Sequence, residues 1–301
     1  MSTSRRTTAL ATLGLLALTA VWGSTFVLIK DVIGRMPVAD FLAVRFAIAA
    51  LTMLVLFARP VFRMGRQQLL HGLLLGVVYG AGQLLQTWGL ALIAPSVSGF
   101  VTGMYVVFTP ILALLLLRQR MAAVVWLAVL LSTAGLALLS LNGVSVDPGV
   151  WLTLASAALY ALHIVGLGQW SRQGEAFGMS AVQMVAIAVV CLLATLPHGP
   201  QLPPDRSAWF AVLYMALIAG AGAMLVQTWA QSHLPATRTA IVMTTEPVFA
   251  AAFAVALGSD VLSWRMLLGG GLILAAMYLV ELLPPKGGAV TLPAEAVHHE
   301  V

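Results

Sequence analysis

Long apolar runs separated by short polar connections recur along the whole chain. The first begins after Arg5 and Arg6 and continues through Ile29. At about 22 residues it is long enough to cross the roughly 30 Å hydrocarbon core of a bilayer. Nine similar runs follow, and turn-forming stretches such as GRMPVAD and NGVSVDPG separate them. The pattern predicts ten transmembrane spans, at residues 8–29, 38–57, 69–93, 97–117, 123–141, 149–169, 179–197, 207–231, 238–257 and 264–283.

These runs predict helices, because a backbone in lipid must satisfy its own hydrogen bonds. A strand of a membrane barrel needs only about ten alternating residues, far fewer than each run contains. The composition agrees: 61% of the residues are hydrophobic, 8% are charged and the mean hydropathy is +1.00, whereas soluble proteins carry roughly 25% charged residues. The N-terminal run imitates a signal peptide but is too long for one, so we interpret it as the first span. The fold class is therefore all-α integral membrane.

The lysines and arginines are distributed unequally between the two sides of the predicted bundle. Four basic residues fall in the connections on one side and ten on the other, with Arg45 inside a span left out. Because positive residues concentrate on the cytoplasmic side, we expect both termini to be cytoplasmic in a plasma (inner) membrane protein. The four are Lys30, Arg35, Arg206 and Arg265; the ten are Arg5, Arg6, Arg59, Arg63, Arg66, Arg118, Arg120, Arg172, Arg238 and Lys286.

The net charge of +5 does not indicate nucleic acid, because the basic residues are scattered without a patch interleaved with aromatics. The single cysteine, Cys191, excludes an intrachain disulfide and a cysteine metal cluster. We expect no cofactor and no metal. Residues 285–301 are polar and rich in Pro and Gly, which predicts a disordered cytoplasmic tail.

The chain resembles itself at a constant spacing. GAGQLLQTWGLA at 80–91 is similar to GAGAMLVQTWAQ at 220–231, and a shift of 141 without gaps matches Trp88 to Trp229 and Phe108 to Phe249. The halves are then 1–145 and 146–284, each with five spans. Because five is odd, the two halves enter the membrane from opposite sides. Inverted repeats of this kind are typical of alternating-access transporters, whose site lies near the midplane where the halves meet.

Five stretches carry a resemblance to the EamA family of the drug/metabolite transporter superfamily over residues 8–283: WGSTFVLIK at 22–30, FLAVRFAIAAL at 41–51, SGFVTGMYVVFTPILALLLL at 98–117, TRTAIVMTTEPVFAAAFAVALG at 237–258 and GGGLILAAMYLVE at 269–281. The resemblance implies a ten-helix carrier of two inverted five-helix repeats with a central cavity and cytoplasmic termini. Many such carriers export amino acids or other metabolites, and some import solutes. One departure is LRQR at 117–120, where the family often carries a Gly-Glu pair.

Glu246 is an acid inside an apolar span. Counted from Arg238 at 1.5 Å per residue, it lies roughly 12 Å deep, near the predicted midplane, and Tyr105 is its counterpart at shift 141. An ionised acid at that depth is costly and needs a partner or water. The candidate roles are a proton-titrating coupling group, a counter-charge for a substrate ammonium, or a structural hydrogen bond. Pro247 predicts a kink and a hinge.

Arg45 is the other charge deep within a span, roughly 10 Å from the outer face by the same helical rise. Three interpretations stay open. Arg45 pairs with Glu246 in one transport state; its guanidinium binds a substrate carboxylate; or it snorkels to the outer interface.

Polar and aromatic residues at matched places in the two halves complete the candidate site. Trp22, Ser24 and Thr25 form a patch in the first span, and Tyr160 and His163 hold roughly equivalent places in the sixth. His163 is a proton relay or a satisfied buried histidine. Gln83 is a candidate cavity residue, whereas the trios at 86–88 and 227–229 are expected to be interfacial anchors, because each lies near a helix end.

These features favour a secondary transporter that exports amino acids, metabolites or drug-like organic solutes. The alternatives are a solute importer, a flippase for lipid-linked intermediates and a non-transporting membrane subunit. An enzyme is disfavoured because the spans contain no metal-ligand spacing, phosphate loop or nucleophile motif. The expected partners are membrane lipid, a small-molecule substrate for which a zwitterion such as an amino acid is one candidate, and protons for coupling. Both a monomer and a homodimer stay open.

Overall fold

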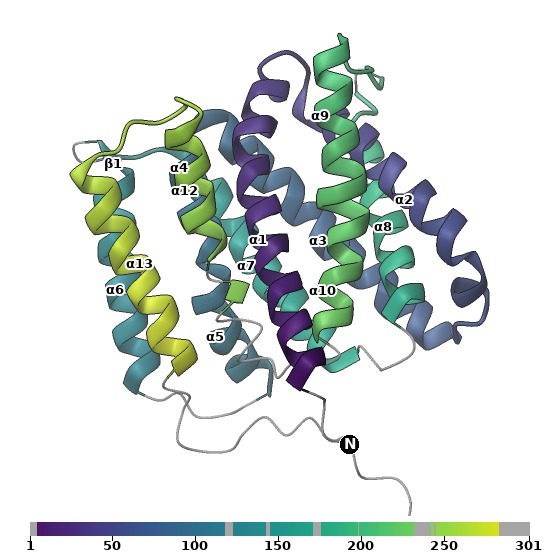
Figure 1. Ribbon diagram of the computed structural model, residues 1–301, viewed down its shortest axis with the longest axis horizontal. Coiled ribbons are helices and arrows are strands. Elements are labelled where there is room, and N and C mark those ends of the chain that lie inside the picture. The colour runs from purple at the N-terminus through teal and green to yellow at the C-terminus, as the bar shows by residue number, and fades with distance from the viewer. Residues whose placement is uncertain are drawn as a thin grey trace, which may run out of the picture.

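The computed structural model describes residues 5–117, 123–142, 145–170, 176–197, 199–231, 242–243 and 245–282, and these residues are almost entirely helical (Figure 1). A two-stranded antiparallel ladder of β1 and β2 is the exception. The elements are α1 (Arg5–Ile33), α2 (Val38–Phe62), α3 (Arg66–Leu92), α4 (Pro95–Gly103), α5 (Tyr105–Leu117), α6 (Ala123–Ser140), β1 (Leu141–Asn142), β2 (Ser145–Val146), α7 (Pro148–Trp170), α8 (Ala176–Leu193), α9 (Arg206–Ala216), the π-helix η1 (Leu217–Gly222), α10 (Ala223–Gln231), α12 (Glu246–Ala256) and α13 (Trp264–Leu282).

Seven helical segments of the described chain are long and apolar enough to cross a membrane. They confirm an all-helical, multi-pass membrane protein. The other three predicted spans correspond to shorter apolar helices at Trp126–Gly135, Glu246–Ala256 and Trp264–Leu279. The seven are Thr7–Ile33, Val38–Phe62, Arg66–Leu92, Pro95–Leu116, Pro148–Trp170, Ala176–Leu193 and Arg206–Ala230.

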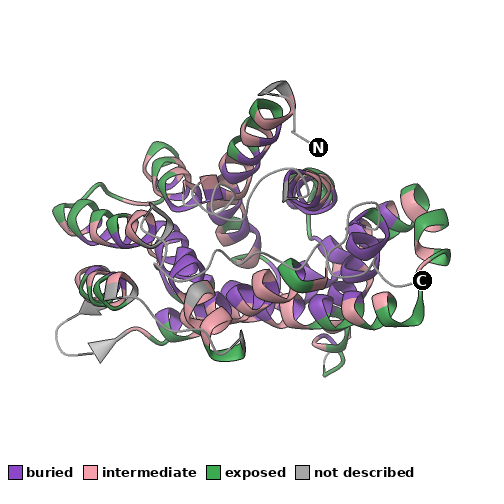
Figure 2. Cartoon of the chain, turned by 90° about the horizontal axis from the view of Figure 1, so that it is seen from below, coloured by how far each residue is buried: buried purple, intermediate pink, exposed green. Residues whose placement is uncertain are grey.

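The helices turn their buried faces toward one another and their apolar outer faces outward (Figure 2). Large hydrophobic side chains are strongly exposed on that surface, including Val55 at 74% and Phe210 at 74%. In water such a surface would associate, whereas in a bilayer it faces lipid tails of the same polarity. The exposed apolar girdle therefore follows from lipid being the solvent.

Helices distant in sequence pack together (Figure 1). α2 packs on α8, α3 on both α7 and α8, α6 on α13, and α1 on α12. The approach of α4 to α12 is close because small residues line it: a Cβ placed on Gly99 would lie 2.6 Å from the Ala250 Cβ, and one on Gly103 would lie 2.7 Å from the Pro247 Cγ. As the residue number rises along α4 it falls along α12, so the two helices run in opposite directions.

The start of α9 is held from outside the helix. Asp205 caps it, with a carboxylate oxygen 2.9 Å from the Ala208 N–H, and its other oxygen lies 2.7 Å from the Arg35 guanidinium. Arg35 also pairs with Asp31. The Ala208 N–H first, and then Arg35, hold the pKa of Asp205 below its usual range. This contribution to stability is therefore present at neutral pH and is lost only as the pH falls through the lowered pKa.

The spacing of Gly72, Gly76 and Gly80 predicts close helix packing, and the structure places all three against α8. At Gly76 an added Cβ would lie 2.6 Å from both the Gln183 carbonyl oxygen and the Ala186 Cβ. Backbone atoms cannot rotate away as a side chain can. The distance between α3 and α8 therefore depends on this residue having no side chain.

Gly76→Ala is expected to destabilise the protein by about 1–3 kcal/mol, because the two helices must separate to admit the methyl group. Gly168→Ala is the matched control, since that helical glycine has no heavy atom within 4 Å of an added Cβ. Unfolding in detergent, followed by denaturant titration, measures both. Equal stability of the two variants would contradict the close-packing argument.

Candidate functional site

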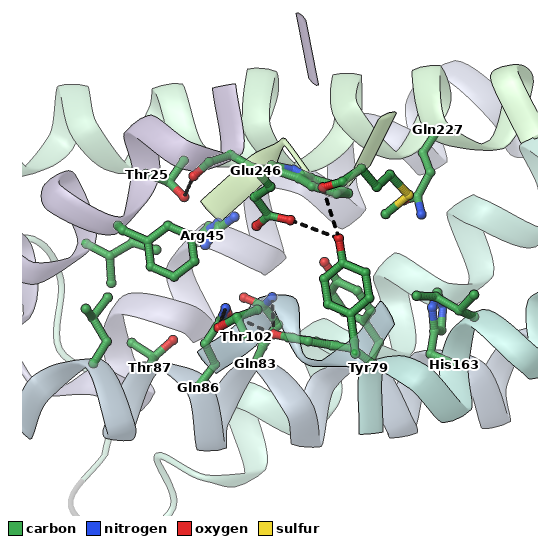
Figure 3. A pocket seen from close by; sticks show the side chains of 18 residues that line it. Thr25, Arg45, Tyr79, Gln83, Gln86, Thr87, Thr102, His163, Gln227 and Glu246 are labelled. Atoms are coloured by element: carbon green, nitrogen blue, oxygen red, sulfur yellow. Dashed lines mark hydrogen bonds between the residues drawn. The ribbon is translucent and has the colours of Figure 1, made fainter. Parts of the chain in front are cut away.

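Eight helices contribute residues to one polar cavity between them (Figure 3). The cavity volume is about 60 Å³. The lining residues come from both halves of the chain: Trp22, Thr25, Phe26, Ile29, Arg45, Tyr79, Gln83, Gln86, Thr87, Leu90, Thr102, Tyr105, Tyr160, His163, Ile164, Gln227, Met243 and Glu246.

Glu246 and Tyr105 meet across this cavity (Figure 3). The Tyr105 hydroxyl donates to the Glu246 Oε2 at 3.3 Å, and Glu246 is only 7% exposed. Glu246 begins α12, and Pro247 occupies the first turn. At that position a backbone N–H would have no carbonyl acceptor within the helix, so the N–H that proline lacks is not missed. A carboxylate there also faces the positive end of the helix dipole. Pro247 thus packs against Gly103 at a helix start, and its predicted hinge role stays a prediction.

Arg45 faces the same cavity from α2 and is 5% exposed. Its side chain is therefore buried in the protein and does not extend to the outer membrane interface. Its Nε donates to the Met215 carbonyl at 3.2 Å, and its guanidinium lies 4.9 Å from the centre of the Phe46 ring. Among the described residues no ion pair joins Arg45 to Glu246 within 4.0 Å. In this conformation two side chains that can bear opposite charges share a cavity without pairing.

A chain of hydrogen bonds connects α3, α4 and α7 at the cavity wall. The Gln83 Nε2 donates to the Tyr160 hydroxyl at 2.6 Å, and that hydroxyl donates to the Gln86 Oε1 at 2.9 Å. The Gln86 Nε2 in turn donates to the Thr102 hydroxyl at 3.0 Å. Each polar group has a partner, so the wall is fixed in shape and still presents amides and hydroxyls to a solute.

His163 and the first-span patch are placed differently from one another. His163 is 2% exposed; its Nε2 lies 2.7 Å from the Gln183 Oε1 and its ring lies edge-on to Tyr79. Trp22 and Thr25 line the cavity. Ser24 does not: its hydroxyl lies 3.0 Å from the Tyr214 hydroxyl, between α1 and α9. The patch therefore divides between the cavity and a helix contact.

Several lining residues were not expected from the sequence. Gln86, Thr87 and Gln227 were interpreted as interfacial, yet all three are buried and line the cavity, whereas Trp88 is 40% exposed. Tyr79 and Thr102 were not singled out at all. The available signal was the repeated Gln-Thr pair itself, since its two polar members recur at shift 141 beside an outward-facing tryptophan.

Tyr160→Phe removes a hydroxyl that serves two buried amides. The glutamine groups it leaves unpaired are expected to cost about 1–3 kcal/mol of stability. Thermal unfolding in detergent measures the effect, and Gln83→Leu in the same background is the control. Since the leucine removes one of the two amides, the double variant should lose less than the sum of the single changes. Strict additivity would show that the hydroxyl does not serve both amides.

Comparison with known proteins places these features in a family. The model of the EamA-like transporter family matches residues 9–141 and again residues 147–282. An "Uncharacterized transporter" of Archaeoglobus fulgidus is 28% identical over 273 residues, covering 90% of this chain and 86% of the relative. The "Uncharacterized inner membrane transporter YedA" of Escherichia coli K12 is 28% identical over 295 residues, covering 94% and 92%. A solved structure described as "Crystal structure of protein" shares the fold, with a TM-score of 0.67 at 20% identity over 93% of this chain and 98% of its own. The chain belongs to the EamA-like transporter family.

Proposed function

We propose that this protein is a secondary carrier that exports small zwitterionic organic solutes, such as amino acids, across the plasma membrane by alternating access. The observation that carries the proposal is the cavity that presents Arg45 and Glu246 without an ion pair between them. The family and the relatives support transport in a membrane; the solute class, the direction and the mechanism are the proposal.

The charge of the cavity favours a solute that carries both signs. An isolated charge in a low-dielectric interior is costly, and the cost falls when an opposite charge binds beside it. A guanidinium binds a carboxylate through parallel hydrogen bonds, and an ionised Glu246 provides a counter-charge for an ammonium. The lining amides and hydroxyls offer further polar contacts to the solute. Protonation of Glu246 in place of solute binding would couple export to proton entry.

The packing of the two halves supports an inverted repeat of ten spans in two five-helix units, 1–145 and 146–284. Tyr105 and Glu246, which hydrogen-bond to each other, are 141 residues apart, the same shift that aligns the halves. The fifth and tenth spans also meet in opposite directions: a Cβ on Gly135 would lie 2.9 Å from the Ile273 side chain, and the Arg265 Nε donates to the Leu138 carbonyl. Together with the excess of arginine on one side, this favours cytoplasmic termini.

We place Lys30 at one end of the cavity, the outer end in this orientation, because it follows the lining residue Ile29 and bonds to the lining residue Leu90. Its ammonium donates to the carbonyls of Leu90, Ala91 and Ile93, at 2.7, 2.9 and 2.9 Å, where α3 ends. A cation at a helix C-terminus is favoured by the helix dipole. Because Leu90 itself lines the cavity, the contact ties α1 to α3 directly above the site. Opening to the outside requires these bonds to break.

Lys30→Met is expected to favour the outward-open state by about tenfold or more, because it removes charge-assisted hydrogen bonds. With Cys191 replaced by alanine, a cysteine at Leu90 should then react faster with an impermeant thiol reagent added outside the cell. Lys30→Arg keeps the charge and is the control, expected to stay slow. Unchanged labelling in the methionine variant would remove Lys30 from the gate.

Glu246→Gln tests the proposed function itself. Cells that express the wild type should accumulate one class of zwitterionic solute in the medium above an empty-vector control. The glutamine variant, expressed at a matched level, should export it with about tenfold to hundredfold weaker apparent affinity, because a charge-assisted contact is lost. Asp31→Asn, whose side chain is 64% exposed away from the cavity, is the matched control.

The outcomes separate the alternatives. Equal export by the wild type and the glutamine variant would keep transport and reduce Glu246 to a structural role. No enrichment of any solute by the wild type would overturn export and favour an importer, a lipid-linked-intermediate flippase or a non-transporting subunit. Repeating the assay with a collapsed proton gradient tests the coupling.

A further inference from the structure

The span Arg206–Ala230 is interrupted by a π-helix, η1, between α9 and α10. GAG at 80–82 matches GAG at 220–222 in η1 at a shift of 140, one less than the shift of 141 that aligns the residues from Gln86 onward, and residues 80–82 lie within the regular helix α3. A π-helical turn accommodates one more residue than the α-helix it interrupts, and such turns are rare and often lie at functional sites. The two halves therefore differ at this place, and the difference needs a physical cause.

The hydrogen bonds around η1 show what the extra residue does. The Ala223 N–H bonds to the Ile218 carbonyl, five residues back, and to the Gly220 carbonyl. It thereby passes over the Ala219 carbonyl, which would be its α-helical partner. That carbonyl instead accepts a hydrogen bond from the Trp22 indole N–H at 2.9 Å.

A second cavity side chain bonds to the backbone just before η1. The Arg45 Nε donates to the Met215 carbonyl at 3.2 Å, in the last turn of α9. Trp22 and Arg45 both line the cavity. Two side chains that line the cavity therefore bond to this backbone, Trp22 to Ala219 within η1 and Arg45 to Met215 just before it.

The sequence gives a reason for the asymmetry. Tyr160 of the second half, which roughly matches Trp22, bonds to the side-chain amides of Gln83 and Gln86 in the first half. The counterpart of Gln83 is Ala223 at shift 140 or Met224 at shift 141, and neither side chain has an amide. Trp22 therefore needs another acceptor, and the carbonyl that the π-turn leaves without its α-helical N–H supplies one.

The π-turn also sets the rotation of everything after it. In the present register Gln227 faces the cavity, and Val226 faces α1, where its Cγ1 lies 3.3 Å from a Cβ placed on Gly14. If η1 relaxed to an α-helix with α9 held in place, each residue of α10 would turn about 100°. Val226 would then take the place of Gln227 in the cavity. The Asp205 cap and its contact with Arg35 provide the anchor for α9.

We propose that Trp22 and Arg45 are positioning residues that hold η1 in its π register and so keep Gln227 in the cavity. The role of the solute in this mechanism rests on the proposed transport function. A solute that binds the Arg45 guanidinium or the Trp22 indole competes with the Met215 and Ala219 carbonyls for those donors. Binding then releases the π-turn, α10 rotates, and the polar wall on that side is replaced by valine. Solute binding in this way changes the helix that forms the wall.

The test reads the register directly by cysteine labelling. In the full-length protein in membranes, with Cys191 replaced by alanine, single cysteines are placed at Val226 or Gln227 and reacted with a small water-soluble thiol reagent. The cysteine at 227 should react faster than the one at 226. Trp22→Phe keeps an aromatic ring and loses the N–H, so the ratio of the two rates should shift toward 226 by about tenfold, the equivalent of one hydrogen bond. Trp126→Phe, on an outer face where the indole is 59% exposed, is the matched control.

A one-residue deletion separates positioning from loss of stability. Deleting Gly222 removes the extra residue, so α10 keeps its present rotation with no π-turn to hold. In that background Trp22→Phe should leave the cysteine introduced for Gln227 the faster one. The proposal would be overturned if Trp22→Phe kept the wild-type ratio of the two rates or changed both rates equally. It would also be overturned if the deletion failed to restore the wild-type ratio in the Trp22→Phe background. If the deletion variant does not fold, the ratio in Trp22→Phe alone decides. Labelling needs no solute and no transport, so this result is independent of whether export is found.

Discussion

Low dielectric constant is the constraint on which this structure depends. Where lipid surrounds a helix and protein fills its inner side, a polar group is satisfied by another protein group or by water in a cavity. The Tyr105–Glu246 contact meets this constraint where α5 and α12 begin, beside the contact of α4 with α12. Its geometry in turn requires Gly99 and Gly103, because larger residues would hold the helices apart. One requirement, that a buried polar group has a partner, therefore accounts for the position of Glu246. It also accounts for the small residues beside it and for the close contact of α4 with α12.

The cavity wall answers the same requirement in two ways. In the first half, glutamines supply amides to Tyr160, and the backbone of α3 stays regular. In the second half neither counterpart of Gln83, Ala223 or Met224, has an amide, and backbone carbonyls in and beside η1 accept the hydrogen bonds of Trp22 and Arg45. A side-chain acceptor leaves a helix rigid, whereas a backbone acceptor makes the helix itself part of the site. Two repeats with similar sequences thus differ in the acceptors they offer, and under the proposal above the second repeat is the one that responds to an occupant.

Much of the fold and of the cavity is readable from the sequence, because lipid makes each span a long apolar run. Glu246 stands out because no charge lies near it, and the shift of 141 leads from it to Tyr105, its hydrogen-bond partner. Depth counted along straight helices fails for Gln86 and Gln227, since it ignores which face of the helix a residue occupies. Ser24 fails for the same reason, as it is one position from a lining residue and points at α9.

The start of α12 and the π-turn lie beyond such reasoning. Pro247 inside an apolar run predicts a kink; the structure places the proline in the first turn of α12, which begins at Glu246, and its effect on the path of the span stays a prediction. The donors that bond to the π-turn come from α1 and α2, about 170 to 200 residues away, and only its extra residue is visible in the sequence, as the change of shift from 140 at Gly-Ala-Gly to 141 at Gln-Thr-Trp. Hydrophobic periodicity along the chain does not predict features that depend on contacts with distant helices.

The lysine that caps α3 has one more consequence. Three carbonyl oxygens share its ammonium, and the dipole of a 27-residue helix ends on them. If the lysine withdraws as proposed, those oxygens lose its N–H donors, and water has to reach them at the same moment. Separation of the helices and hydration of the passage are then a single event. A molecule leaving by this route would enter a channel that is already wet, and would exchange its protein contacts for water before it reached the membrane surface.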